Sequence, residues 1–387
     1  MGVASGQGQL GLVQRPVLQR PMLHRVAMTA VFVGNGVAFG AWAASIPRVR
    51  EASGLTDGAL GLLLLCVSLG AVAAMQLAGR YAGRIGTARA CSLAAPLLAV
   101  ALPGPALAPS WPWLLASGLA LGLGLGLLDV CMNAHAAWLE RRRGRPIMSS
   151  FHAGWSLGQL VGAAGAGALA AAGLGVVPGL AIPGAAVALC GLAALALPEA
   201  PYDPPARTRW TWPSPAIAVL AGLVSLSFAI EGGVSDWSSV YFSTVLGASA
   251  VAASSSIAVY AAAMVVMRLV GDALVRRLGP VRVVAGGGAV AGVGLAVVLL
   301  APGVWLAAAG FALVGVGVAN IVPVLFSAAG ARGAAGVSLV ATAGYGTSMA
   351  APPLIGFVSD GAGLRTGLCL LLAAAVGLAV LGRRMGQ

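Results

Sequence analysis

The stretch LLDVCMNAHAAWLERRRGRP, residues 127–146, places an acid and an amide inside an apolar run and then ends that run in arginines. Asp129 and Asn133 are four residues apart, so a helix would carry both on one face. An ionised carboxylate in hydrocarbon costs several kcal/mol unless it faces water or a partner. The arginines from Arg141 onward are typical of the cytoplasmic end of a membrane helix. This stretch therefore predicts a membrane-spanning helix with a polar site in its middle.

The composition of the whole chain agrees with a membrane protein. Of its 387 residues, 59% are hydrophobic and only 8% are charged, and the mean hydropathy is +0.95. A soluble domain carries about 25% charged residues. Repeated apolar runs of about 20 residues are long enough to cross a bilayer as helices. The runs lack the alternation that a barrel needs, so we expect an all-α, polytopic membrane protein.

Twelve apolar runs are candidate membrane spans. They are expected at 25–46, 57–79, 90–108, 112–139, 147–172, 176–197, 215–242, 249–270, 283–301, 303–329, 336–359 and 362–382.

The distribution of the arginines predicts the orientation. The net charge is +12 and there is no lysine. With the N-terminus in the cytoplasm, 19 arginines fall on the cytoplasmic side, Arg268 among them, and only Arg48, Arg50 and Arg365 fall outside. This bias places both termini in the cytoplasm. Because the arginines form short clusters between apolar runs, and no single basic face, the pattern excludes a nucleic-acid partner.

A Pro-rich linker, PEAPYDPPARTRWTWPSP, divides the runs into two sets of six that repeat weakly. GRYAGRIG (79–86) corresponds to GDALVRRLG (271–279), AWAAS (41–45) to DWSSV (236–240), and AGWS (153–156) to AGYG (343–346), all 190–195 residues apart. We therefore expect two pseudo-symmetric six-helix bundles. The expected parts are a cytoplasmic tail at 1–24, a first bundle at 25–197, a cytoplasmic linker at 198–214, a second bundle at 215–382 and a cytoplasmic tail at 383–387.

With this duplication the chain resembles the major facilitator superfamily (MFS) of transporters. LDVCMN, SSFHAGWSLGQ and NIVPVLFS resemble the branch of fucose-permease-like symporters and uncharacterised inner-membrane permeases. That branch has an acid four residues before an asparagine on its fourth helix, which Asp129 and Asn133 match. The resemblance also implies a gating loop after the second helix of each half. The matching residues are Gly79, Arg84, Gly86, Gly271, Asp272, Arg276, Arg277 and Gly279.

Two acids are the candidates for proton coupling. Asp129 lies twelve residues before Arg141, about 18 Å from the cytoplasmic end. Protonation near neutral pH would remove the cost of burying it, and a protonatable group can carry a proton across. Glu231 is the corresponding acid of the second half. Asp236, farther out beside Trp237, is expected at the membrane interface, and Glu140 is expected in a surface ion pair.

Polar and aromatic side chains at helical spacing outline an expected binding cavity. In lipid such stripes must face the inside of the bundle. The candidates for substrate binding are Asn35, Trp42, Asn133, His152, Trp155, Gln159, Asn320 and Tyr345.

These features predict a secondary transporter of a small polar solute, sugar-like or glycosylated, coupled to protons by symport. A proton-antiporting exporter is the alternative, because Gly154, Gly158 and Gly162 match half of an exporter motif on the fifth helix. A receptor or scaffold is a third class.

No nucleophile and base pair or metal cluster indicates an enzyme, and the scattered cysteines indicate no disulfides. We expect no cofactor besides the proton gradient, a lipid bilayer and a small molecule as partners, a monomer, and an inner-membrane location.

Overall fold

The structure, a computed structural model, describes residues 20–143, 147–201, 214–330 and 334–386. The side chains of a few residues inside these ranges are not described. Most of the expected N-terminal tail and of the expected linker lies outside the described residues. Within them all regular structure is helical, as the sequence predicts.

Helices of the first half begin at Pro21 and follow the expected spans. They are α1 (Pro21–Ala52), α2 (Asp57–Ile85), α3 (Thr87–Ala101), α4 (Gly104–Leu107), α5 (Trp111–Arg143), α6 (Met148–Ala171), α7 (Val176–Leu192) and the 3-10 turn η2 (Ala193–Ala196). The short α4 continues the third expected span, which is broken at Leu102 and Pro103.

The second half also holds six spans, but here the fourth of them is divided into two helices. Its helices are α8 (Pro215–Thr244), α9 (Ala250–Leu278), α10 (Pro280–Leu300), α11 (Val304–Val318), α12 (Ile321–Gly330), α13 (Ala334–Ala362), α14 (Leu364–Leu381) and the 3-10 turn η3 (Gly382–Gly386). Over the described residues, ten helices or helix pairs are long and apolar enough to cross a membrane. With α6 and α13, of 24 and 29 residues, they account for the twelve expected spans.

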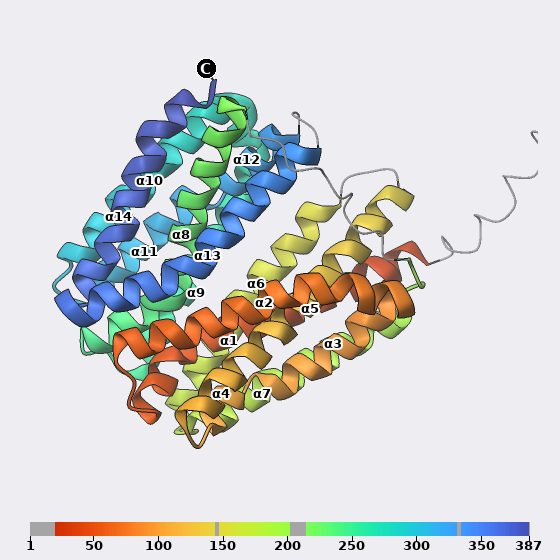
Figure 1. The fold of residues 1–387 in the computed structure, drawn as a ribbon, viewed down its shortest axis with the longest axis horizontal. Helices are drawn as coiled ribbons and strands as arrows, with labels where there is room; N and C mark the ends of the chain where they lie inside the picture. The colour runs from red at the N-terminus through yellow and green to blue at the C-terminus, as the bar shows by residue number, and fades with distance from the viewer. Residues whose placement is uncertain (1–19, 144–146, 202–213, 331–333, 387) are drawn as a thin grey trace, which may run out of the picture.

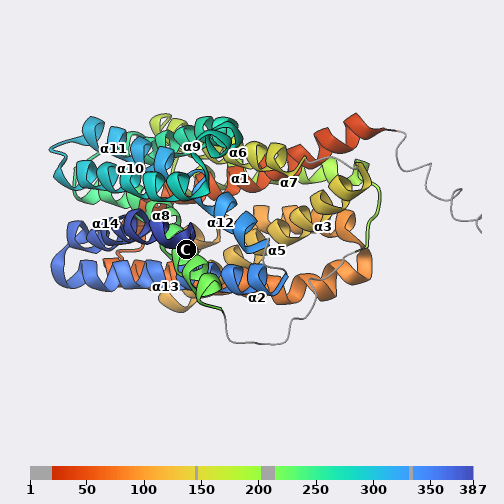
Figure 2. The same cartoon turned by 90° about the horizontal axis from the view of Figure 1, so that it is seen from above.

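The helices form two bundles that meet at one end (Figure 1). In the first bundle α1 packs on α6 and α7, and α2 and α3 pack on α5. In the second, α8 packs on α13 and α14, and α11 packs on α9 and α10. Figure 2 shows the two bundles side by side, joined where α2 contacts α13 and where α6 contacts α9. From that junction the bundles diverge in Figure 1 towards the end that carries the start of α1 and the C-terminus.

Glycines in the turns between helices show the duplication of the two halves. In the described residues six glycines have positive φ, a conformation that other residues adopt only with strain. They form three pairs: Gly54 with Gly247, Gly86 with Gly279, and Gly173 with Gly363. The members of a pair are 193, 193 and 190 residues apart and occupy equivalent turns, so both halves turn their chain in the same way.

Glycines also bring α1 and α6 into backbone contact. A Cβ atom at Gly158 or Gly162 would collide with the carbonyl oxygens of Val33 or Val37 in α1. From the other side, a Cβ atom at Gly40 would collide with the backbone of Gln159. The glycines of the half-matched exporter motif therefore have a packing role, because small residues let membrane helices approach closely.

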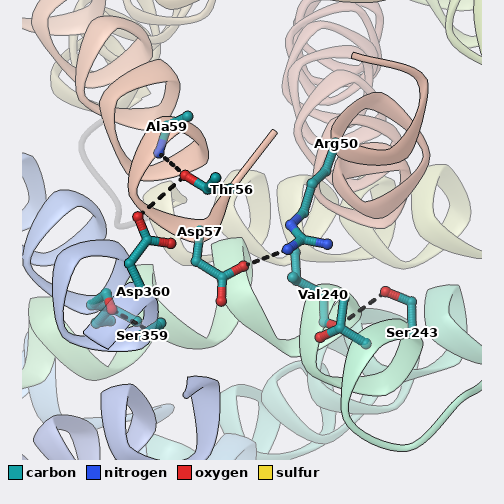
Figure 3. A network of polar contacts seen from close by, with 10 residues as sticks. Arg50, Thr56, Asp57, Ala59, Val240, Ser243, Ser359 and Asp360 are labelled. Atoms are coloured by element: carbon teal, nitrogen blue, oxygen red, sulfur yellow. Dashed lines mark hydrogen bonds and ion pairs between the residues drawn. The ribbon is translucent and has the colours of Figure 1, made fainter. Parts of the chain in front are cut away.

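Polar contacts join the two bundles where α1 ends and α2 begins, which we call the closed end (Figure 3). Thr56 caps α2 by accepting a hydrogen bond from the backbone N of Ala59 at 3.2 Å. Its hydroxyl also donates to Asp360 of α13 at 3.2 Å. Beside it Arg50 forms an ion pair with Asp57 at 2.9 Å. Nearby, Ser239 of α8 donates to the carbonyl of Ala43 in α1 at 2.7 Å.

We expect Asp360→Ala to open the closed end more often. Loss of the bond between Thr56 and Asp360 removes about 1 kcal/mol from the closed arrangement, or about fivefold in the population of the open one. A cysteine at Ser45, which is buried near this end, should then react severalfold faster with a membrane-impermeant maleimide in a background without the native cysteines. Glu51→Ala, at an exposed acid of the same end, is the control. Equal labelling rates in the two variants would contradict the expectation.

Candidate functional site

A cavity of about 250 Å³ lies between the two bundles. It is lined from both halves, by α1, α2, α5 and α6 on one side and by α8 and α13 on the other. The polar and aromatic lining residues are Asn35, Phe39, Trp42, Ser68, Asp129, Trp155, Asp236, Tyr345 and Ser348. A second hollow, of about 350 Å³, lies between α8, α13 and α14, but its lining is almost entirely apolar, which suits acyl chains better than a polar solute.

Asp129 of α5 lines the cavity, as the sequence predicts. Asn133, one turn further along the helix, donates a hydrogen bond to the carboxylate of Asp129 at 3.2 Å and another to its backbone carbonyl at 2.9 Å. The two residues form one polar unit, because their spacing of four places them on the same face. Asn133 is thus the partner of the acid, and it is not among the lining residues of the cavity.

Trp155 and Asn35 form a fixed wall of the cavity. The indole N–H of Trp155 donates to the side-chain oxygen of Asn35 at 2.8 Å, and the amide of Asn35 donates to the carbonyl of Leu125 at 3.3 Å. The ring of Trp155 also contacts Phe39, with centroids 5.4 Å apart. These contacts link α1, α5 and α6, so the indole holds one orientation and offers its remaining surface to the cavity.

Asp236 corrects one expectation from the sequence. It was expected at the membrane interface, but it lines the cavity from α8, opposite the half that carries Asp129. Its carboxylate makes neither a hydrogen bond nor an ion pair with the described residues. The cavity therefore holds one acid from each half, and the acid of the second half is Asp236, not Glu231.

Glu231 lies instead beside Arg268 of α9. Its carboxylate is 3.9 Å from the Arg268 guanidinium and accepts a hydrogen bond from Ser227 at 3.2 Å. Arg268 also donates to the hydroxyl of Ser156 in α6 at 2.7 Å, which joins the two halves. Counting Arg268 with the cytoplasmic arginines is wrong, because it lies ten residues before the end of α9 and is engaged inside the molecule.

We expect Glu231→Gln to destabilise the protein, because it leaves Arg268 without a counter-charge within the membrane. Removing one partner of a half-buried pair should lower the free energy of unfolding by about 1–2 kcal/mol, since partial exposure weakens the effect. The double variant Glu231→Gln/Arg268→Gln should recover most of the loss. Thermal melting of the purified variants, monitored by tryptophan fluorescence, measures the loss of stability in the single variant and its recovery in the double variant. A double variant as unstable as the single one would show that the pair is not the cause.

The remaining predicted binding residues fall into two groups. Trp42 and Tyr345 line the cavity, and Tyr345 is held by an edge contact with Phe228. His152, Gln159 and Asn320 are not among its lining residues. His152 is exposed and contacts the ring of Phe32. Gln159 is buried where α6 packs on α1, and Asn320 donates to the carbonyl of Met267 within the second half at 3.0 Å.

Several lining residues were missed by the sequence reasoning. Ser68 of α2 and Ser348 and Met349 of α13 complete the cavity. Ser68 is a single hydroxyl in an apolar run, which gives no pattern to detect. Ser348 and Met349 follow Tyr345 by three and four residues, so the helical spacing from Tyr345 is a signal that could have found them. Glu140 was expected in a surface ion pair, and its carboxylate also accepts hydrogen bonds from the backbone N–H groups of Ile147 and Met148 at the start of α6.

The candidate gating loops are the turns that follow α2 and α9. Gly86 and Gly279 end these helices with φ of 88° and 81°. Arg84, Arg276 and Arg277 are exposed in the preceding turns, and Gly271 packs against the side chain of Asn320. The side chain of Asp272 and the surroundings of Gly79 lie outside the described part of the chain. The two loops share a geometry, and their gating role stays a prediction.

The described residues hold neither a candidate metal site nor a disulfide. No group of three or more His, Cys, Asp or Glu side chains there is placed to hold a metal ion. The five cysteines are free thiols.

Comparisons with known proteins agree with the geometry. Residues 27–335 match the family model of the Major Facilitator Superfamily. An uncharacterized MFS-type transporter of Yersinia pestis is 32% identical, over 90% of this chain and 92% of that protein. An uncharacterized transporter of Sinorhizobium fredii, y4wD, is 33% identical, over 89% of this chain and 93% of that protein.

Solved structures share the fold at low sequence identity. A mutant of the nucleoside transporter NupG superposes with a TM-score of 0.74 at 13% identity, over 94% of this chain and 100% of that one. A D-xylose–proton symporter gives 0.68 at 17%, over 93% and 97%. A mutant of the E. coli fucose:proton symporter FucP gives 0.62 at 15%, over 95% and 100%. From the family model and the two relatives, the chain belongs to the Major Facilitator Superfamily, whose members are membrane transporters and not enzymes.

Proposed function

We propose that this transporter carries a small polar solute together with protons through the central cavity. The observation that carries the proposal is the position of Asp129, a carboxylic acid that faces the cavity between two bundles joined at one end. In transporters built from repeated halves, a midplane site is exposed to the two sides of the membrane in turn as the halves rock. An acid at that site would be loaded with a proton on one side and unloaded on the other.

The lining of the cavity supports a sugar-like or glycosylated solute. Asn35, Ser68 and Ser348 offer amide and hydroxyl groups, while Trp155 and Tyr345 offer flat apolar surfaces. This mixture suits a ring that has hydroxyl groups at its edge and apolar faces. Two proteins that share the fold, the D-xylose–proton symporter and FucP, are symporters of sugars, which is compatible with the proposal but does not carry it.

The orientation forms part of the same proposal. Placing both termini on the cytoplasmic side of the inner membrane follows from the arginine bias. The closed end then faces outward, and the end towards which the bundles diverge faces the cytoplasm, so the conformation is inward-facing. We propose that one chain suffices for transport, because the cavity is lined by both halves of the same molecule.

Export by proton antiport is the alternative. Its support from the sequence was the half-matched glycine motif of the fifth span. Since Gly158 and Gly162 have a packing role against α1, the motif does not distinguish export from import.

Vesicles of opposite orientation test the direction. Right-side-out and inverted vesicles would be given a pH gradient and radiolabelled D-xylose, L-fucose or D-glucosamine, with an electrode recording the external pH. Symport predicts that at least one solute moves with the proton gradient and that adding it makes the medium of right-side-out vesicles more alkaline. Movement against the gradient would favour the exporter, and solute uptake without any proton movement would contradict the coupling.

A further inference from the structure

The charges around the cavity are unbalanced. Two carboxylates, Asp129 and Asp236, line it from opposite halves, and none of its described lining residues is basic. Arg268 is engaged by Ser156 and Glu231 and forms no ion pair with either aspartate. An unpaired carboxylate within the membrane is costly, and either a bound proton or a cation that enters the cavity can remove that cost.

The two acids differ in what already contacts them. The carboxylate of Asp129 accepts a hydrogen bond from Asn133 at 3.2 Å. Asp236 has no partner among the described residues, although it lines the same space. One acceptor position of Asp129 is thus already occupied, and Asp236 is the acid whose oxygens are all left for a ligand.

Aromatic rings surround the same space. Phe39, Trp42, Trp155 and Tyr345 all line the cavity. The face of an aromatic ring attracts a cation, and tryptophan does so most strongly. Asn35 holds the ring of Trp155 in place through the indole N–H, so this surface is formed before the ligand arrives. A carboxylate without a partner beside several aromatic rings is the composition of a site for an organic ammonium group.

We propose that the solute carries a protonated amino group, which Asp236 binds as counter-ion against the aromatic rings. The inference rests on the proposed function, since it names the substrate class of the same cavity. The solute class becomes a small hydroxylated molecule with one amine, such as an amino sugar. The rival arrangement is a neutral solute with a proton on each aspartate.

Three sugars that share one ring test the proposal. D-Glucosamine carries an ammonium group where D-glucose has a hydroxyl and N-acetyl-D-glucosamine has a neutral amide. Binding to the purified full chain in lipid nanodiscs would be measured by calorimetry at constant pH. We expect D-glucosamine to bind at least about tenfold more tightly than the other two, which is the scale of one charge-assisted hydrogen bond.

Variants assign the preference to one carboxylate. Asp236→Asn should lower the affinity for D-glucosamine about tenfold and leave that for D-glucose unchanged, whereas Asp236→Glu should keep most of the preference. Glu51→Gln, at an exposed acid outside the cavity, should bind like the wild type. Melting curves without ligand show that each variant is folded. A preference for the amine that survives in Asp236→Asn would overturn the assignment.

A second pair of probes covers the case in which no sugar binds. Choline and its uncharged isostere 3,3-dimethyl-1-butanol differ in the charge of one group. Tighter binding of choline, lost in Asp236→Asn, would support the proposal, and the absence of any preference for the charged member of both series would overturn it. Because these measurements involve no gradient, their failure leaves proton-coupled transport standing. Binding of the amine without proton movement in vesicles would overturn only the coupling.

Discussion

Asp129→Asn abolishes accumulation of the solute driven by a pH gradient. One pH unit supplies about 1.4 kcal/mol per proton, so two units should support an accumulation ratio of about 100 when one proton accompanies each solute molecule. Asparagine has nearly the shape of the acid but cannot take up or release a proton. The ratio in the variant should therefore fall to about 1, as measured by uptake of labelled solute into right-side-out vesicles.

Exchange of solute across the membrane separates coupling from folding. In counterflow, labelled solute outside replaces unlabelled solute inside, and no net proton movement is required. We expect Asp129→Asn to retain counterflow, and Glu51→Gln to behave like the wild type in both assays. A variant that still accumulated solute to the wild-type ratio would remove Asp129 from the mechanism.

Gly162→Ala disrupts the packing of α6 on α1. Its new methyl group would collide with the carbonyl oxygen of Val37, and neither backbone can yield as a flexible side chain would. Overpacking of this kind costs about 1–3 kcal/mol, which exceeds the gain of about 1 kcal/mol from replacing glycine within a helix. Expression of folded protein and the melting temperature in detergent should both fall.

Gly165→Ala is the matched control for that prediction. Gly165 lies three residues further along α6, and apart from its chain neighbours and the nearby backbone of its own helix no atom lies within 4 Å of the position that its Cβ would take. This variant should be as stable as the wild type or slightly more stable, because only the helical preference changes. If the two variants melted at the same temperature, the close approach of α1 and α6 would be refuted.

The helices could be predicted because a bilayer leaves the chain few choices. Apolar runs have to satisfy their own backbone groups, which permits helices and sets their length. The pairing of Asp129 with Asn133 could be predicted for a similar reason, since residues four apart meet on any helix.

The face that each helix turns to the cavity could not be predicted. Glu231 and Asp236 are five residues apart, so they point about 140° away from each other around α8. Only one of them can face the cavity, and the packing of α8 on α9, α13 and α14 decides which. The sequence shows both acids, but it does not determine how α8 is rotated about its own axis.

Arg268 shows a limit of reading orientation from charge. Ten residues separate it from the end of α9, about 15 Å, which is too far for its side chain to reach that end of the helix. The positive-inside rule counts basic residues near helix ends. It takes no account of polar side chains within the bundle that could bind an arginine there. Ser156, which binds it, belongs to a different half of the chain and is 112 residues away.

The backbone contact between α1 and α6 has a mechanical consequence. At Gly158 and Gly162, where a Cβ atom would collide with the carbonyl oxygens of Val33 and Val37, no side chain separates the two helices, and this restricts their sliding. We therefore expect α1 and α6 to move together as one rigid unit. Relative movement of the halves then takes place at the surfaces between them, where α9 contacts α6 and α1, α8 contacts α1, and α13 contacts α2. Small residues such as Gly167 of α6 and Ser254 of α9 form part of the surface at which these two helices contact each other.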